Sequence, residues 1–460
     1  MKPGEQPPKI TTAGLRRELR LRDLVLFNIC AIVSVRWIAV AAHTGPGSLS
    51  LWIVAALFFF LPSAVVVGRL SERFPEEGGM YIWTKRAFGD RHAFLCSWFY
   101  FVSNILYLPS LVMAGLGMTA YVFGDVGSRF AENRAIALPV AFGALWAVFL
   151  ANYFGIKVAK SISALGGSAI FITVAALTAF AIAAALHSGT ITHFRLLPSP
   201  KKETLNFWAQ IAFAFVGLEL APILSGEMRN PRRDIPLAAI ISGVACALFY
   251  IVGTASMLVL LKPEDINPMT GLAQAGAATA RLFHSPALSV LFATLIGIGV
   301  GGQLDTWIAG NTRLPYAIGL DHYLPESFAR VHPRWGTPHV ALFSQALASS
   351  LFLLMCGLGE TVSGAYQIMV DMTVIATFLP FLYIFGAGFR FASRIAAIFG
   401  LGITFLAIGL SLLPPPDAAA ATTFELKMLG GLLLFATLGC FIFKRYEAKR
   451  LQGDRVIVVP

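Results

Sequence analysis

Long apolar runs separated by short polar segments make up most of this chain. Each run has about the 20 residues that an α-helix needs to cross the hydrocarbon core of a bilayer. Residues do not alternate in polarity as they do in transmembrane β-strands. We therefore expect an all-α membrane protein with twelve transmembrane helices, at residues 23–41, 47–69, 93–123, 136–154, 161–187, 205–226, 235–261, 285–312, 337–356, 361–387, 394–413 and 424–443.

The composition agrees with this pattern. Hydrophobic residues make up 57% of the chain and charged residues 13%, whereas a soluble domain carries about 25% charged residues. The first 22 residues are polar and basic and lack the short apolar core of a signal peptide. The net charge of +11 is shared by many nucleic-acid-binding proteins, but basic cytoplasmic loops that fix the orientation in the membrane explain it better. We expect no nucleic-acid partner, and the sequence leaves the oligomeric state open.

The distribution of basic residues predicts the orientation. With the N-terminus inside, the inner segments hold 26 of the 35 Lys and Arg residues. Because cytoplasmic loops carry an excess of Lys and Arg, both termini are expected in the cytoplasm. This predicts a multi-pass protein of the inner membrane, with a cytoplasmic N-terminal arm at residues 1–22 and a cytoplasmic tail at residues 444–460.

Two segments between spans, 72–92 and 313–336, mix polar and aromatic residues and are expected to form interfacial helices. They occupy similar places in two five-span halves, which predicts repeats at 23–187 and 205–387, followed by helices 11 and 12 at 394–443. An odd number of spans forces the two repeats into opposite orientations. Residues 76–79 within the first segment are interpreted as a turn and helix cap, with an inside latch as the alternative.

Residues 205–236 carry the strongest sign of a site. Gly217, Glu219 and Pro222 interrupt an apolar run that ends at a basic turn rich in proline. A carboxylate at membrane depth is costly and usually faces a cavity or a partner. Gly and Pro beside it favour a helix that breaks where it lines a site.

Several motifs in order along the chain carry a resemblance to a known family. They are Gly45-Pro46-Gly47, PEEGGMYIWTKRAFGD at 75–90, FAFVGLE at 213–219 with NPRRDIP at 230–236, and the segments 304–325 and 328–338. The chain resembles the amino acid-polyamine-organocation transporter superfamily, which has the leucine-transporter fold. The resemblance implies secondary active transport by alternating access, with spans 1, 2, 6 and 7 rocking against spans 3, 4, 8 and 9. It also implies that the substrate's amine and carboxylate bind where spans 1 and 6 are broken.

The sequence departs from the family at two positions. The glycine-rich break of span 1 falls on Ser34, Val35, Arg36 and Trp37, which include no glycine. We expect this break to be costly, because Val and Trp resist unusual backbone conformations. The span 5 lysine that is thought to replace sodium in some members is absent from residues 164–170.

Arg36 has two interpretations. It could bind a substrate carboxylate through both of its parallel N–H groups, or form a structural ion pair with Glu219, Asp305 or Asp371. We also consider these three carboxylates as proton-coupling or gating groups. The alternative for Glu219 is to hold free N–H groups at the helix break, and for Asp305 and Asp371 it is to pair with Arg36 or with polar neighbours.

The predicted substrate-binding residues lie at the two expected helix breaks and on spans 3 and 8, and several of them are aromatic. They are Ser34, Val35, Arg36, Trp37, Asn104, Phe213, Phe215, Val216, Gly217 and Trp307. The alternative for the aromatic residues is packing, although cation–π contact with an amine is also open. The alternative for Asn104, which shares a helical face with Tyr100 and Tyr107, is hydrogen bonding between helices.

The sequence therefore predicts a secondary transporter of an amino acid, driven by protons, by sodium or by exchange. A polyamine or organic amine transporter is the alternative, and a channel or a transporter-like sensor is the alternative from a different class. The histidines are scattered and the sequence has no HExxH, Walker or GxSxG motif. We expect no enzyme activity, no metal and no cofactor apart from a coupling ion, H+ or Na+.

Overall fold

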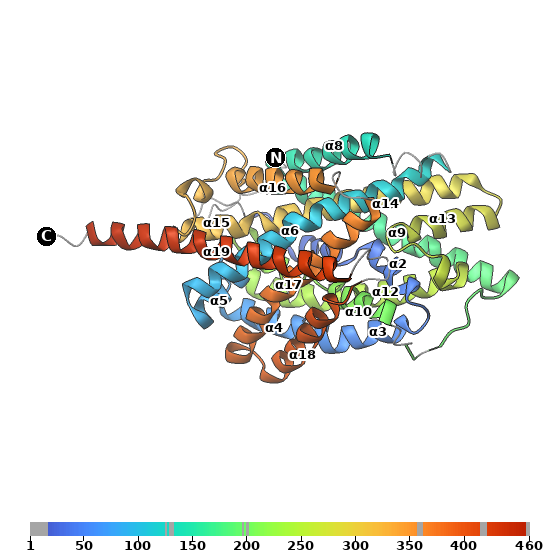
Figure 1. The fold of residues 1–460 in the computed structure, drawn as a ribbon, viewed down its shortest axis with the longest axis horizontal. Coiled ribbons are helices and arrows are strands. Elements are labelled where there is room, and N and C mark those ends of the chain that lie inside the picture. The colour runs from blue at the N-terminus through green and yellow to red at the C-terminus, as the bar shows by residue number, and fades with distance from the viewer. Residues whose placement is uncertain are drawn as a thin grey trace, which may run out of the picture.

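The computed structural model describes residues 17–124, 127, 133–195, 197–198, 202–356, 362–414 and 421–456, and its regular elements in these ranges are helices (Figure 1). Ten helical segments of the described chain are long and apolar enough to cross a membrane. Many large apolar side chains on these helices are exposed, including Leu165, Ile182 and Ile240. A soluble protein would bury such side chains. The chain is therefore a multi-pass, all-α membrane protein.

The first part of the chain forms a run of helices from residue 21 to residue 188. They are α1 (Leu21–Ile32), α2 (Val35–His43), α3 (Ser48–Ala55), α4 (Leu61–Arg73), α5 (Met80–Phe88), α6 (Asp90–Thr119), α8 (Arg134–Tyr153) and α9 (Ile156–Ser188). A π-helical turn, Ala56–Phe60, makes α3 and α4 nearly continuous. The segment 72–92 contains the helix α5, and its expected interfacial position stays a prediction.

The second part begins with α10 (Lys202–Phe213) and α11 (Leu220–Ile223). It continues with α12 (Pro231–Leu260), α13 (Gly271–Leu282), α14 (Pro286–Asn311), α15 (Arg313–Leu320), α16 (His339–Cys356), α17 (Val362–Phe391), α18 (Arg394–Ser411) and α19 (Ala421–Val456). The segment 313–336 begins with the helix α15, which follows α14 with almost no interruption and is largely buried. Its expected interfacial position stays a prediction. Within the predicted span 361–387, residue 361 lies outside the described residues.

α14 packs closely against α9. A Cβ on Gly302 of α14 would lie 2.5 Å from the Cα of Gly166 on α9. Only two facing glycines allow the backbones to approach this closely, which is a common way to pack helices in a membrane. α6 packs along α17 and α14, and α1 packs along α12 and α9. This packing fixes the scaffold around the broken helices.

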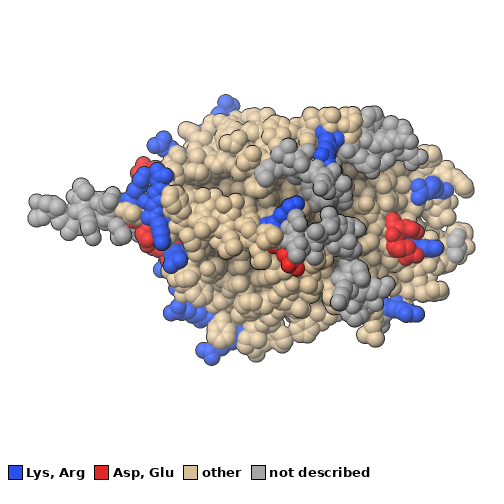
Figure 2. Space-filling view, in the orientation of Figure 1, with Lys and Arg blue, Asp and Glu red and all other residues tan. Residues whose placement is uncertain are grey.

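Charged side chains gather at the end of the molecule from which α19 projects (Figure 2). Lys444, Arg445 and Lys449 lie on this part of α19. The broad middle of the molecule in the same view is largely uncharged. The surface thus has the band expected of a protein embedded in lipid.

The first predicted span is broken between α1 and α2. Val33 has φ −75° and ψ 109°, and Ser34 has φ −120° and ψ 124°. Both residues are in the extended region, which β-branched residues adopt readily. The expectation that a break without glycine is costly is therefore wrong. Val35, Arg36 and Trp37 do not form the break, because they are the first turn of α2.

The predicted span 205–226 is broken after Phe213. Residues 214–219 form turns before α11, and Gly217 has φ 131°. A Cβ on Gly217 would lie 3.1 Å from the carbonyl carbon of Ala31 and 3.2 Å from the nitrogen of Ile32. Glycine is needed here both for its backbone conformation and for this close approach. The two helix breaks therefore touch each other inside the molecule.

Candidate functional site

Arg36 lies at the first turn of α2 and is completely buried. Its guanidinium lies 4.4 Å from the ring centroid of Trp37 and 4.6 Å from that of Tyr107. One nitrogen, Nη1, donates to Ser110 Oγ at 3.1 Å. The other two, Nε and Nη2, have no hydrogen-bond partner among the described residues. A buried cation with so few partners is costly, and such groups commonly mark a functional site.

Glu219 does not pair with Arg36. Its Oε1 accepts a hydrogen bond from the Tyr100 hydroxyl at 2.6 Å. Its Oε2 accepts one from the Gly217 amide at 3.0 Å. The carboxylate therefore holds a free backbone N–H at the break after α10, which is one of the two roles predicted for it.

The two other intramembrane carboxylates also have neutral partners. Asp305 on α14 accepts hydrogen bonds from Asn152 Nδ2 at 2.7 Å and from Ser163 Oγ at 2.8 Å. Asp371 on α17 accepts them from the side-chain amides of Gln210 and Gln367, at distances of 3.1 and 3.2 Å to its Oδ1. The predicted ion pair of Arg36 with any of the three acids is therefore wrong.

Two side chains of α14 donate hydrogen bonds to backbone carbonyls at the C-terminal end of α1. Trp307 Nε1 donates to the Ala31 carbonyl at 3.0 Å. Gln303 Nε2 donates to the Val33 carbonyl at 3.2 Å. Carbonyls at a helix C-terminus favour positive charge and hydrogen-bond donors. Trp307 was predicted at the site, and the polar residue one turn before it, Gln303, could have been recognised from its spacing.

Tyr250 of α12 bridges both breaks. Its hydroxyl lies 2.6 Å from the Ile32 carbonyl and 3.0 Å from the Ala214 carbonyl, and it accepts from the Ser34 amide at 3.1 Å. A hydroxyl carries one hydrogen, so it donates to one of the two carbonyls at a time. This role could not be predicted from the sequence, because Tyr250 lies in a largely apolar run with no motif around it.

Two aromatic rings, those of Trp37 and Tyr107, lie against Arg36, and the Tyr366 hydroxyl also faces it. Two further rings pack on this pair. Phe213 contacts Trp37 edge-on with centroids 5.4 Å apart, and the ring of Trp307 lies 5.0 Å from that of Tyr107. We call these four rings and Arg36 the arginine pocket.

Phe215 lies in a different aromatic cluster. Its ring contacts those of Trp52, Tyr250 and Phe60 at centroid distances of 5.6, 5.5 and 5.3 Å. These contacts are packing between α3, the π-helical turn and α12. Among the aromatic candidates, Phe213 and Trp307 thus pack against the two rings that contact Arg36, whereas Phe215 lies in the other cluster.

The remaining candidates are buried around the breaks. Val35 and Val216 are buried apolar residues. Asn104 donates weakly to the Tyr100 carbonyl at 3.5 Å. Its Oδ1 and the Ser34 hydroxyl have no hydrogen-bond partner among the described residues. Unsatisfied buried polar groups are uncommon in native proteins and call for a partner.

Comparison with known proteins identifies the wider relationship. The sequence profile of the amino acid permease family matches residues 19–431. An uncharacterized transporter of Legionella pneumophila is 23% identical over 94% of this chain and 98% of its own length. The probable agmatine/putrescine antiporter AguD of Lactococcus lactis is 22% identical over 94% and 95%. The branched-chain amino acid permease BcaP of Bacillus subtilis is 25% identical over 75% and 76%.

Proposed function

The chain belongs to the amino acid permease family, and we propose that it is a secondary transporter whose substrate is an amino acid with a free carboxylate. Arg36 is the observation that carries this proposal. Its Nε and Nη2 are the two donors on one edge of the guanidinium, and both lack a partner among the described residues. That edge is the one that binds a carboxylate through two parallel hydrogen bonds.

The position of Arg36 on α2 supports the same substrate group. It lies at the N-terminus of a nine-residue helix, where unpaired N–H groups and the helix dipole favour an anion. A substrate carboxylate would neutralise the buried charge, so its binding is favoured by the cost of leaving Arg36 unpaired. The substrate amine would approach the carbonyl end of α1, where Trp307 and Gln303 now donate.

A polyamine or other organic amine is the second candidate. Two observations favour an amine substrate. The site region has three buried acids and one buried arginine, and the Lactococcus relative is named as a probable agmatine/putrescine antiporter. Against it, Glu219, Asp305 and Asp371 each have hydrogen-bond donors already. Arg36 keeps two donors, Nε and Nη2, without a hydrogen-bond partner among the described residues, and a protonated amine offers them no acceptor.

The proposal includes a layout of twelve spans. Ten of these spans are the long segments. The broken helix made of α10 and α11 would be another, and α16, which is short but apolar, would be the twelfth. Spans 1–5 and 6–10 would form inverted repeats, and the basic end in Figure 2 would face the cytoplasm of the inner membrane with both termini. The chain would act as a transporter without enzyme activity, on a small-molecule substrate and with no nucleic-acid partner.

The mechanism would be alternating access. α1, α2, α4, α10, α11 and α12 would move as a bundle against α6, α8, α14 and α16. The hydroxyl of Tyr250 would hold both breaks in register during this motion, because it bonds to backbone on each side. Protons are the proposed coupling ion, with sodium or exchange as alternatives, and Glu219 is the proposed proton carrier.

Uptake into proteoliposomes tests the function. We expect saturable uptake that depends on the proton gradient. In Glu219→Gln, substrate exchange should persist while uptake no longer responds to the gradient, because the amide cannot be charged. Glu72→Gln, at the exposed end of α4, is the matched control.

Other outcomes identify the other classes. Flux that does not saturate and needs no gradient would indicate a channel. Binding without flux would indicate a sensor. An unchanged gradient response in Glu219→Gln would exclude Glu219 as the coupling group.

A further inference from the structure

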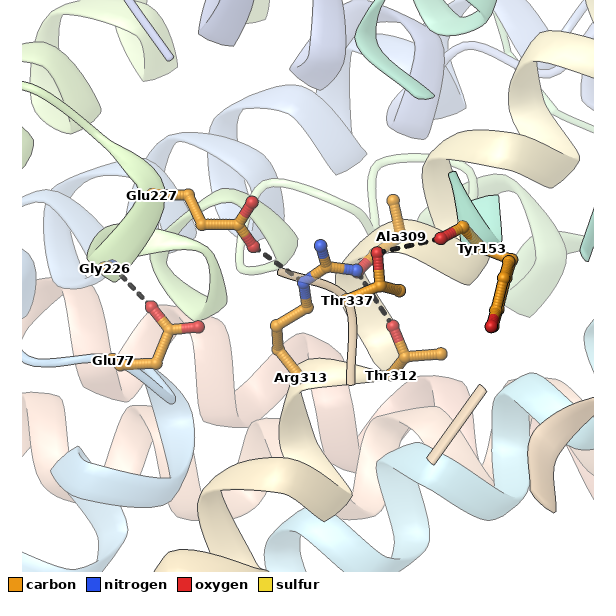
Figure 3. A network of polar contacts seen from close by, with 8 residues as sticks. All are labelled: Glu77, Tyr153, Gly226, Glu227, Ala309, Thr312, Arg313 and Thr337. Atoms are coloured by element: carbon orange, nitrogen blue, oxygen red, sulfur yellow. Dashed lines mark hydrogen bonds and ion pairs between the residues drawn. The ribbon is translucent and has the colours of Figure 1, made fainter. Parts of the chain in front are cut away.

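Three charged residues meet at the ends of three chain segments, away from the arginine pocket (Figure 3). Glu77 lies in the turn between α4 and α5, Glu227 at the end of the broken span after α11, and Arg313 at the start of α15. In Figure 3, Glu77 and Arg313 flank the turn that carries Gly226 and Glu227. We call these residues the gate cluster.

Arg313 and Glu227 form a buried ion pair. Arg313 Nε donates to Glu227 Oε1 at 2.8 Å, and the side chains are only 3% and 2% exposed. Arg313 Nη1 also donates to the Ala309 carbonyl at 2.7 Å and to Thr312 Oγ1 at 3.0 Å. A buried pair is stable only when its remaining donors are satisfied in this way.

Glu77 adds a second negative charge to this cluster. Its Oε2 accepts a hydrogen bond from the Gly226 amide, whereas its Oε1 is sealed from solvent and has no hydrogen-bond partner among the described residues. Burial and, after it, the charge of Glu227 raise the pKa of Glu77 to about 8, despite the opposing effects of the Gly226 amide and Arg313. One arginine cannot neutralise two buried carboxylates, so the cluster is neutral only with one proton bound.

The other ionisable groups near Glu77 leave this balance intact. Glu76 points to the surface, where it lies 3.7 Å from the exposed Arg86. Glu18 pairs with Lys157 at 3.4 Å. Tyr316 of α15 also faces Glu77, Glu227 and Arg313 and is buried with them.

Backbone contacts join the two acids to one moving unit. The Ile223 carbonyl accepts from the Gly78 amide at 3.3 Å, and the Glu76 carbonyl accepts from Ser225 Oγ at 2.7 Å. The Glu227 carbonyl accepts from the Leu19 amide at 3.0 Å. These segments belong to the proposed bundle, whereas Arg313 continues the scaffold helix α14. The Arg313–Glu227 pair therefore spans the surface along which bundle and scaffold would separate.

We propose that Glu77 is the proton-binding site of a cytoplasmic gate that the Arg313–Glu227 ion pair holds shut. With the proton bound, the cluster is neutral and closed. When Glu77 loses the proton, the excess negative charge needs water, and bundle and scaffold separate at this end. The inference rests on the alternating access proposed above and adds a proton site distinct from Glu219.

The direction of the pH effect follows from linkage. In the open gate, water restores Glu77 to the pKa of about 4.3 of an ordinary glutamate. The closed gate binds the proton more tightly, because Glu77 there has a pKa of about 8. Closure is therefore fully favoured below the ordinary value and is lost as the pH rises through about 8. Within that window the ratio of open to closed protein rises by at most about tenfold per pH unit.

Accessibility of a single cysteine tests this gate without any substrate. Ala309 lies one helical turn deeper in the membrane than Arg313 and is completely buried. In a chain with its native cysteines replaced, Ala309→Cys is labelled by a membrane-impermeant maleimide applied from the cytoplasmic face. Thiol reactivity itself rises with pH, so each rate is divided by the rate for the same protein with Glu77→Gln at that pH.

We expect this ratio to rise by up to roughly a hundredfold between pH 6 and pH 8.5, because the open-to-closed ratio rises about tenfold per pH unit until the pH reaches about 8. Glu76→Gln, the matched control next in the chain, should keep the rise, and Glu77→Asp should keep a shifted one. A flat ratio, or the same loss in Glu76→Gln, would overturn the proposal. Native protein that shows this gating but transports nothing would refute the proposed function alone, and normal uptake with a flat ratio would refute the gate alone. Size-exclusion elution checks that each variant is folded.

Discussion

The sharpest prediction concerns the replacement of Arg36 by methionine. Methionine is long, unbranched and apolar, so it fills a similar volume among the rings of Trp37 and Tyr107. It removes the two donors that we assign to the substrate carboxylate. Removing one partner of a buried charge pair costs about 2–5 kcal/mol of binding free energy. At 1.4 kcal/mol per tenfold change, substrate affinity should fall about 30- to 5,000-fold.

The stability of the substrate-free protein should change little in Arg36→Met. A buried cation without a counter-ion costs about 3–5 kcal/mol. The two cation–π contacts recover about 2 kcal/mol each when they are desolvated, so the loss and the gain roughly cancel. A structural ion pair would behave differently, because its removal would destabilise the protein by about 3–5 kcal/mol.

Thermal shifts with amino acids, and with the amines that lack their carboxylates, measure both effects. A ligand at 100 times its Kd stabilises the native protein by about 2.7 kcal/mol, and a 30-fold weaker affinity leaves about 0.9 kcal/mol at that concentration. Arg36→Lys keeps the charge but not the paired donors, and should be intermediate. Phe215→Leu, in the other aromatic cluster, is the control. Equal loss for the amines, or retained shifts for amino acids, would refute the role of Arg36.

Two further predictions concern the helix breaks. Tyr250→Phe should lower the stability of the folded protein by about 1–3 kcal/mol for each buried backbone group that loses its partner. Tyr446→Phe, in the terminal part of α19, is the control and should leave the melting temperature unchanged. Equal melting temperatures of the two variants would contradict the bridging role of Tyr250. Gly217→Ala should cost about 1–3 kcal/mol through its backbone conformation and should slow uptake by separating the breaks, since its Cβ would press on Ala31. Gly143→Ala on α8, where a Cβ meets nothing within 4 Å, is its control, and normal uptake by Gly217→Ala would show that the contact is dispensable.

The positions of the helices could be predicted from the sequence, because an apolar run of membrane length has few conformations other than a membrane-spanning helix. Every helix needs its backbone hydrogen bonds in lipid, so the position of a span follows from hydrophobicity alone. The break at Gly217 also followed from local chemistry, since glycine beside a carboxylate is rare in such a run. The break at Val33 and Ser34 was anticipated only through the family resemblance, and its extended backbone has no signature in residue type.

The partners of the charged residues depended on the tertiary structure. Sequence identifies Arg36, Glu219, Asp305 and Asp371 as buried charges, and the simplest expectation is that opposite charges pair. The structure instead gives each acid neutral donors from helices distant in the chain and leaves Arg36 among aromatic rings.

The sequence alone therefore determined that this chain crosses a membrane, where its helices lie and which residues are costly to bury. These three properties follow from the transfer free energies of successive residues along the chain. Only the tertiary structure decided which of those costs are compensated, and by what. Hydrogen bonds and ion pairs act over about 3 Å, and whether Tyr250 reaches Ser34, or Arg313 reaches Glu227, is set by helix packing that no local pattern records.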